Sequence, residues 1–303
     1  MYTHKVSSPK YIDKWINNRP KHSKIKNLTL QVEDIDAFLL DLLPDIKDDP
    51  EWPLAVPMWS IVDKNSEKDL ENRALGIVEE HIDQEVFGFS FLDFGCGGGH
   101  VASEVQKKGA RTTVGYDKAI DEHWNLLKKD NLVLTDDWDK VVSLSPYDYI
   151  LAYDVFDHIL DEDVSEKLKV LSSLLSQDGR ISIRFHPWIS RHGAHLYNQI
   201  NKAFIHLLYN EEQLQEMGFA PEKVHKVIHP MWSYKGWIEK AGLKVQKENK
   251  VLEPVEDFFL KNDIFRSKIN LLFRDSPLKE YKEGKGDLAR VMSFHFVDFV
   301  LTK

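Results

Sequence analysis

The sequence predicts an α/β fold: a doubly wound, mostly parallel sheet of seven strands with a helical N-terminal cap and helical inserts. From about residue 88 onward, short apolar runs alternate with segments of helical periodicity, which is typical of a parallel sheet with helices on both faces. A glycine-rich turn, 95–99, separates the first apolar run from the first helix. The length of 303 residues is sufficient for a large domain with a smaller N-terminal region.

Strands are expected where apolar and β-branched residues cluster. In chain order these runs are 89–94, 112–116, 132–134, 149–152, 180–185, 243–246 and 292–301. Helices are expected from residue 101, over 120–129 and over 164–175, where apolar residues recur at helical spacing. The last of these ends at Gln177-Asp178-Gly179, a turn and C-cap signal. The final run, 292–301, follows a helical insert. This order is typical of a last strand that pairs as an edge hairpin of the same sheet.

The chain is expected to divide between residues 87 and 88. Residues 1–87 are assigned to the helical cap, because 35–43 and 70–82 show helical periodicity, and 88–303 to the main domain. The main domain carries inserts at about 187–241 and 251–290. Their expected helices lie at 195–208, 211–217 and 232–241 in the first insert and around 258–272 in the second.

Composition narrows the function classes. Hydrophobic residues make up 42% and charged residues 29% of the chain, which is ordinary for a globular protein. The net charge of −9 disfavours a nucleic-acid partner. A single cysteine, Cys96, excludes a disulfide framework and predicts a cytoplasmic location. No apolar run is long enough to span a membrane. Residues 1–30 hold seven Lys/Arg and a single acidic residue, Asp13. This basic segment is either a solvated arm or an arm that meets an anionic substrate or partner.

The glycine-rich turn is the strongest chemical signal. Glycine permits positive φ and close approach of the backbone to a ligand, and the following helix offers unpaired N–H groups. Asp117 ends the second strand about 20 residues later, where a carboxylate can accept both hydroxyls of a ribose. Asp136, Asp137 and Trp138 follow the third strand and could contact an adenine, although Asp is also favoured as a helix N-cap.

These motifs resemble the class I S-adenosylmethionine-dependent methyltransferases over about residues 88–303. The resemblance rests on Asp93-x-Gly95-x-Gly97-x-Gly99, on Asp117, on the Asp136/Asp137 pair and on the run 147–154. It implies a Rossmann-like methyltransferase fold and S-adenosylmethionine as cofactor. The implied cofactor-binding residues are Asp93, Gly95, Cys96, Gly97, Gly99, Asp117, Lys118, Asp136, Asp137, Trp138, Tyr153 and Asp154. A dehydrogenase fits less well, because His100 stands where its G-x-G-x-x-G fingerprint requires the third glycine.

The segment Asp154-Val155-Phe156-Asp157-His158 follows the fourth strand. It is similar to the acidic-x-x-acidic-His motif of the ubiquinone-biosynthesis O-methyltransferases and the small-RNA 2′-O-methyltransferases, which implies a divalent metal near the acceptor hydroxyl. Those families usually carry glutamates. The similarity extends to His206 as a fourth ligand. Alternatively, His158 acts as a general base, or the acids only complement a helix dipole.

A second dense constellation, 184–195, leaves the fifth strand. It supplies further candidate catalytic histidines: His186, His192 and His195. Arg184 and Arg191 could hold an anionic group of a substrate, and Trp188 could form a wall against a ring. Trp59 of the N-terminal region could close over the substrate as well.

The expected function is methylation of a hydroxyl on a small molecule or on a sugar or glycan precursor. A base removes the proton while the acceptor oxygen is aligned with the methyl carbon. Two alternatives stay open. One is an RNA 2′-O-methyltransferase, and the other is a non-catalytic regulatory protein that binds S-adenosylmethionine, since a fold alone does not establish activity.

Overall fold

The computed structural model describes residues 46–50, 52–58, 66–82, 86–127, 130–159, 161–193, 195–219, 231–256 and 292–303, together with a few isolated positions. The chain divides into two compact units. The first comprises Met1–Pro57, Pro187–Pro230 and Leu252–His295, and the second comprises Met58–His186, Met231–Val251 and Phe296–Lys303. The expected helix 35–43, Trp59 and most of the expected helix 258–272 lie outside the described residues.

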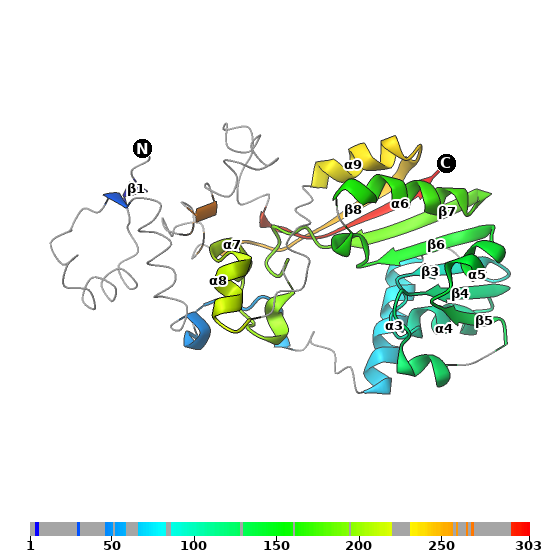
Figure 1. Cartoon of the computed structure of the whole chain (residues 1–303), viewed down its shortest axis with the longest axis horizontal. Helices are drawn as coiled ribbons and strands as arrows, with labels where there is room; N and C mark the ends of the chain where they lie inside the picture. The colour runs from blue at the N-terminus through cyan, green and yellow to red at the C-terminus, as the bar shows by residue number, and fades with distance from the viewer. Residues whose placement is uncertain are drawn as a thin grey trace. The chain divides into compact units, whose positions relative to one another are not determined.

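The second unit is built on a seven-stranded sheet in the order β5-β4-β3-β6-β7-β9-β8 (Figure 1). Neighbouring strands from β5 to β7 run parallel, whereas β9 is antiparallel to β7. The prediction of a seven-stranded, mostly parallel sheet is confirmed. The bounds are β3 Ser90–Phe94, β4 Thr112–Tyr116, β5 Leu132–Thr135, β6 Tyr147–Tyr153, β7 Leu175–Phe185, β8 Lys244–Leu252 and β9 Phe294–Thr302.

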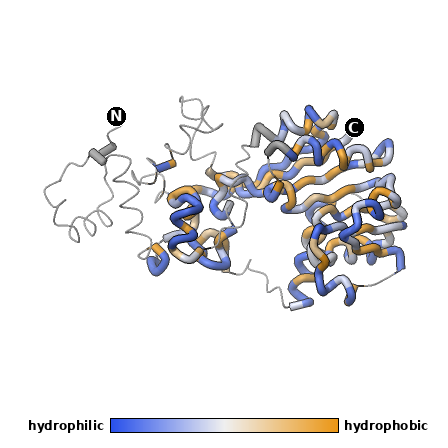
Figure 2. Tube along the Cα trace, in the orientation of Figure 1, coloured by the Kyte–Doolittle hydropathy of each residue, from blue (hydrophilic) through white to orange (hydrophobic). Residues whose placement is uncertain are grey.

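Helices cover both faces of this sheet, as the burial of β6 shows. Tyr149 and Leu151 are buried in a cluster with Ile77 of α3, and Ile150, which points to the opposite face, is also fully buried. Figure 2 shows the apolar residues running along the strands. The helices of this unit are α3 Glu67–His81, α4 His100–Lys107, η3 Glu122–Asn125, α5 Trp138–Ser143, η4 Phe156–His158, α6 Asp161–Ser173 and α9 Met231–Lys240.

Three expected elements differ in the structure. In place of a helix over 120–129, the described residues form the short 3₁₀ helix η3, capped by the Asp121 carboxylate. The expected turn 177–179 lies within β7, where the register against β6 shifts between Tyr147 and Tyr149. The helix α3, expected in one cap with 1–57, lies instead in the unit of the sheet, which begins at Met58, and its apolar face packs on α4 and β3.

The first unit is made of short elements. The expected helix over 195–208 is interrupted: η5 covers Leu196–Asn198 and α7 covers Ile205–Leu208, because Phe204 adopts a φ of +61° that a helix cannot continue. The helix α8, Glu211–Glu216, starts with a capping box between Asn210 and Gln213. Trp52 Nε1 donates to the Ala203 carbonyl at 3.1 Å. None of the described helices is both long and apolar enough to cross a bilayer.

The basic N-terminal region is described at only two places. His4–Lys5 (β1) and Thr29–Leu30 (β2) form a two-stranded antiparallel sheet. The remainder of the arm lies outside the described residues.

Candidate active site

The glycine-rich turn follows β3 at the carboxyl edge of the sheet. Gly95, Gly97 and Gly99 have φ values of +83°, +49° and +81°, in the left-handed region that favours glycine. A Cβ on Gly95 would lie 2.4 Å from Val155, and one on Gly99 would lie 2.8 Å from Leu134. A Cβ on Gly97 would meet no atom within 4 Å. The turn is therefore packed on both sides and open at Gly97, where only a glycine leaves the space free for a ligand.

The backbone of Gly97 is held on both sides of its Cα by two side chains from the segment after β4. Its N–H donates to Asp117 Oδ2 at 3.0 Å, and its carbonyl accepts from Trp124 Nε1 at 2.7 Å. The other Asp117 oxygen accepts from the Ala119 backbone amide at 3.2 Å. Each carboxylate oxygen has a second lone pair, so Asp117 can still accept hydroxyl hydrogen bonds. Sequence reasoning did not identify Trp124, because nothing about a lone tryptophan eight residues after a strand indicates such a bond.

Two side chains of this segment have raised pKa values: the buried Asp93, just before the turn, and the half-buried Cys96 within it. Burial raises the pKa of Asp93 to about 7, and the nearby charge of Asp117 raises it further. A hydrogen bond from the Ala102 backbone amide lowers this pKa but does not offset the effect of burial. Burial likewise raises the pKa of the Cys96 thiol, and the charge of Asp93 raises it further. Cys96 is therefore a neutral thiol whose backbone N–H donates to the Tyr116 carbonyl at 2.9 Å.

The residues after β5 divide into different roles. Asp137 is the N-cap of α5, since its carboxylate accepts from the Asp139 and Lys140 backbone amides. Trp138 packs edge-on against Tyr116, with ring centroids 5.0 Å apart. Asp136 and Lys118 are exposed.

Asp154 and His186 meet at the ends of β6 and β7. These parallel strands place Tyr153 opposite Arg184, so the residues that follow leave the same edge. His186 Nε2 lies 3.2 Å from Asp154 Oδ1. Burial alone raises the pKa of Asp154, but His186, Arg184 and Arg73 outweigh it and hold this pKa at about 2. Asp154 is therefore an anion beside an imidazole.

The backbone at Asp154 is also unusual. Its φ is +54°, a conformation uncommon for residues other than glycine, and its N–H donates to the Arg184 carbonyl at 3.0 Å. Such strain concentrates at functional sites. Tyr153, the residue before it, is half-buried, with the His81 ring 5.1 Å away edge-on.

Arg184 is buried and has an internal role. Its Nη1 lies 2.7 Å from His81 Nε2, and its guanidinium lies 3.5 Å from the centre of the Phe296 ring. Its Nε is 4.0 Å from Asp298 Oδ1. Burial and the Arg184 charge lower the pKa of His81, so this ring is neutral and accepts the bond from Arg184. Arg184 thus ties α3 and β9 to β7. Its contact with an anionic group of a substrate stays a prediction.

The four candidate metal ligands are divided between the two units. Asp154, Asp157 and His158 belong to the second unit. Asp157 is buried and His158 is exposed, and the distance from Asp157 Oδ2 to His158 Nε2 is 3.9 Å. His206 belongs to the first unit, where its Nε2 lies 2.6 Å from the Trp188 carbonyl oxygen. The convergence of all four residues stays a prediction.

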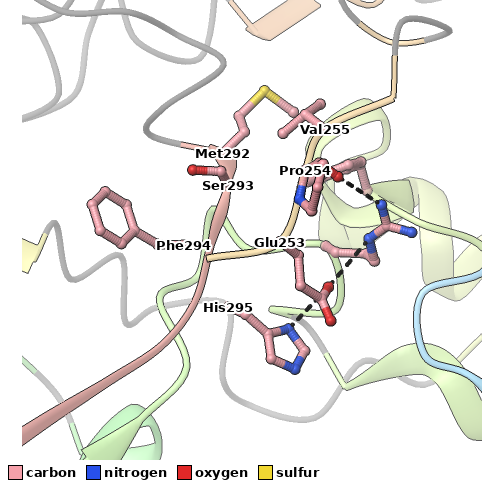
Figure 3. A pocket seen from close by; sticks show the side chains of 9 residues that line it. Glu253, Pro254, Val255, Met292, Ser293, Phe294 and His295 are labelled. Atoms are coloured by element: carbon pink, nitrogen blue, oxygen red, sulfur yellow. Dashed lines mark hydrogen bonds and ion pairs between the residues drawn. The ribbon is translucent and has the colours of Figure 1, made fainter. Parts of the chain in front are cut away.

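Arg191 is bound within the first unit. It pairs with Glu256 and with Glu253, and it donates to the Leu54 and Pro254 carbonyls. Figure 3 shows Glu253 next to His295, whose Nδ1 lies 3.2 Å from Glu253 Oε2. The groove there is lined by Arg191, Phe204, 253–255 and 292–295.

The remaining predicted residues of the 184–195 run lie in the first unit as well. His192 is buried, with the His295 ring 4.8 Å away and the His195 ring 6.2 Å away. Trp188 is buried too, and its ring packs edge-on against His206.

The chain is similar to known methyltransferases, by a family model and among solved structures. A model of the methyltransferase domain family matches residues 32–248. A search of curated proteins finds no match. Among solved structures, a SAM-dependent methyltransferase from Archaeoglobus fulgidus is similar, with 17% identity and a TM-score of 0.45 over 77% of this chain and 94% of the other. Magnesium protoporphyrin IX methyltransferase from Synechocystis gives 14% identity and a TM-score of 0.44 over 89% and 100%. Because the family model covers well over half of the chain, the protein belongs to the methyltransferase domain family, as a class I S-adenosylmethionine-dependent methyltransferase.

Proposed function

We propose that the protein methylates a hydroxyl group on a small molecule or on a sugar or glycan precursor, with His186 as the general base. The observation that carries this proposal is the contact between His186 Nε2 and Asp154 Oδ1 at 3.2 Å, at the same sheet edge as the glycine turn. Bound S-adenosylmethionine supplies an electrophilic methyl carbon there.

The residues of this edge fit that cofactor. The open space beside Gly97 suits a ligand against the backbone, and Asp117 can accept from a ribose diol. Asp136, exposed after β5, is the candidate for the adenine amine, and Trp138 for the ring. Tyr153 and Asp154 are the candidates at the methionine end, as the family resemblance implies.

The Asp154–His186 pair can move a proton. Because the pKa of Asp154 is about 2, this carboxylate is charged at neutral pH and favours a proton on His186 Nε2. Nδ1 is then the basic atom and would take the proton of the acceptor hydroxyl as the new carbon–oxygen bond forms and the methyl carbon–sulfur bond of the sulfonium breaks. Asp154 orients the ring and stabilises the imidazolium, as a carboxylate does in other acid–base pairs. Geometry therefore favours His186 over the exposed His158 as the base.

The test combines a search for the acceptor with matched histidine variants. The protein is incubated with S-adenosylmethionine carrying a labelled methyl group and a fractionated cell extract, and the labelled component is identified by mass. His186→Gln is then expected to lower kcat by about 10²–10⁴-fold at unchanged cofactor affinity. His158→Gln is the control, with a smaller loss expected. Equal activity of His186→Gln and wild type would contradict the role of His186.

The same assay separates the alternatives. Label in RNA would favour a 2′-O-methyltransferase, and cofactor binding without any labelled acceptor would favour a regulatory protein. Loss of activity with a chelator, restored by Mg²⁺ or Mn²⁺, would support a metal held by Asp154, Asp157, His158 and His206.

A further inference from the structure

One side chain outside the predicted site, that of Trp124, is bonded to the backbone of the glycine turn. Gly97 is the turn residue whose missing side chain leaves open space, so the two peptide planes that flank it form part of the surface open to a ligand. The N–H and the carbonyl of a residue belong to these two successive planes, and bonding both planes fixes the φ and ψ angles between them. Asp117 bonds the N–H of Gly97, and Trp124 bonds its carbonyl at 2.7 Å.

Trp124 is itself held firmly. It lies in η3, is 8% exposed, and its backbone N–H donates to the Asp121 carbonyl at 3.2 Å. The Asp121 carboxylate caps η3 by accepting from the His123 backbone amide at 2.9 Å. The short helix thus presents the indole N–H at a fixed place, and an indole N–H can only donate.

We infer that Trp124 is a positioning residue for the cofactor: its indole N–H fixes the carbonyl of Gly97 and keeps the turn in the binding conformation before the cofactor arrives. A site that is ordered in advance loses less conformational freedom on binding, and affinity rises accordingly. Neutral Trp124 and charged Asp117 then hold the two successive peptide planes that flank the Gly97 Cα.

A purely structural tryptophan offers the matched control. Trp52 is also buried and also donates its Nε1 proton to a backbone carbonyl, that of Ala203 at 3.1 Å, but it lies in the first unit. Trp124→Phe and Trp52→Phe each remove one such hydrogen bond and keep an aromatic ring. Any general cost of losing an indole N–H therefore appears in both variants.

Calorimetry with S-adenosylmethionine and with its demethylated product measures the effect. Wild-type binding is established first, so that a wrong cofactor is recognised as such. Trp124→Phe is expected to bind each ligand about 2- to 12-fold more weakly, the range for one neutral hydrogen bond, and Trp52→Phe with wild-type affinity. In Asp117→Asn/Trp124→Phe, the two losses are expected to be non-additive, because both side chains fix the backbone angles of Gly97.

The indole ¹H–¹⁵N resonances report on the intact protein even if a variant fails to fold. The resonance of Trp124, assigned by its loss in Trp124→Phe or by selective labelling, is expected to move on addition of the cofactor, whereas that of Trp52 stays in place. Wild-type affinity in Trp124→Phe, or an unmoved Trp124 resonance at saturating cofactor, would overturn the inference.

Discussion

Gly97 and Gly95 show how neighbouring residues of one motif differ in what they contribute. Gly95 is needed because Val155, from the loop after β6, would collide with any side chain there. The glycine turn and the loop that carries Asp154 are therefore packed against each other. Gly97 is needed for the opposite reason, since the space beside it is open.

Gly97→Ala is expected to fold and to lose cofactor affinity. The positive φ costs a residue with a side chain about 1–2 kcal/mol of folding free energy. Overlap of the new methyl group with a ligand costs about 1–3 kcal/mol more, or about 5- to 150-fold in affinity. Gly88→Ala is the matched control, because Gly88 has a φ of +77° and equally open surroundings outside the turn. Calorimetry and thermal unfolding separate the effects; equal affinity in both variants would argue against ligand contact at Gly97.

At the residue scale, the side chains that follow each strand could be predicted from the sequence, but the contacts between these side chains could not. The sequence places Asp154 after one apolar run and His186 after the next strand, so their shared edge follows from parallel topology. Which histidine contacts Asp154 depends on the register between β6 and β7 and on the positive φ of Asp154. A positive φ at a residue other than glycine cannot be recognised from the sequence. The Arg184–His81 bond joins residues 103 positions apart, beyond any local pattern.

At the scale of elements, apolar runs located the strands well, because the central strands are buried on both faces. The helices were less predictable where a single contact overrides periodicity. The expected helix over 195–208 is broken between η5 and α7. The backbone N–H of Phe204, just before α7, donates to the Arg191 carbonyl at 2.9 Å instead of to a carbonyl one turn earlier. The segment after β4 forms η3, from which Trp124 reaches the glycine turn.

Arg191 is expected to hold the elements of the first unit together. It joins the segments around Leu54, Phe204 and 253–256. Arg191→Gln would leave Glu253 and Glu256 without this partner and is expected to destabilise the unit by about 2–4 kcal/mol. Arg191→Lys keeps the charge but not the fork of donors, and an intermediate loss is expected.

Thermal unfolding followed by circular dichroism, with limited proteolysis, checks this expectation. Cofactor affinity is expected to stay unchanged in both variants, because the glycine turn belongs to the second unit. An unchanged unfolding temperature together with a raised KM for the acceptor would instead support the original hypothesis that Arg191 binds the substrate.

For the whole molecule, the buried carboxyl of Asp93 makes stability depend on pH. Its folded pKa of about 7 lies above the ordinary value of 3.8, so the folded state binds the proton more tightly than the unfolded state. The contribution of this protonation to the free energy of unfolding is fully present below about pH 4 and is lost as the pH rises through about 7. The loss is at most about 1.4 kcal/mol per pH unit.

Denaturant unfolding at pH 5 and pH 8 measures this term. Wild type is expected to lose more stability between the two values than Asp93→Asn, whose amide does not titrate. Asp136→Asn, which changes an exposed aspartate, is expected to follow the wild-type profile. Identical pH profiles for wild type and Asp93→Asn would show that Asp93 is charged at both values.

The position of β9 has a consequence for the order in which a growing chain can fold. β8 ends at Leu252 and β9 begins at Phe294, yet β9 lies between β7 and β8 in the sheet. During synthesis, β3 to β7 and the Asp154–His186 pair can assemble first, while β8 has no neighbouring strand until β9 emerges from the ribosome. Arg184 meets Asp298 only at that last step. A nascent chain stalled before β9 therefore presents an open β7 edge and an incompletely paired arginine, the kind of surface that chaperones bind.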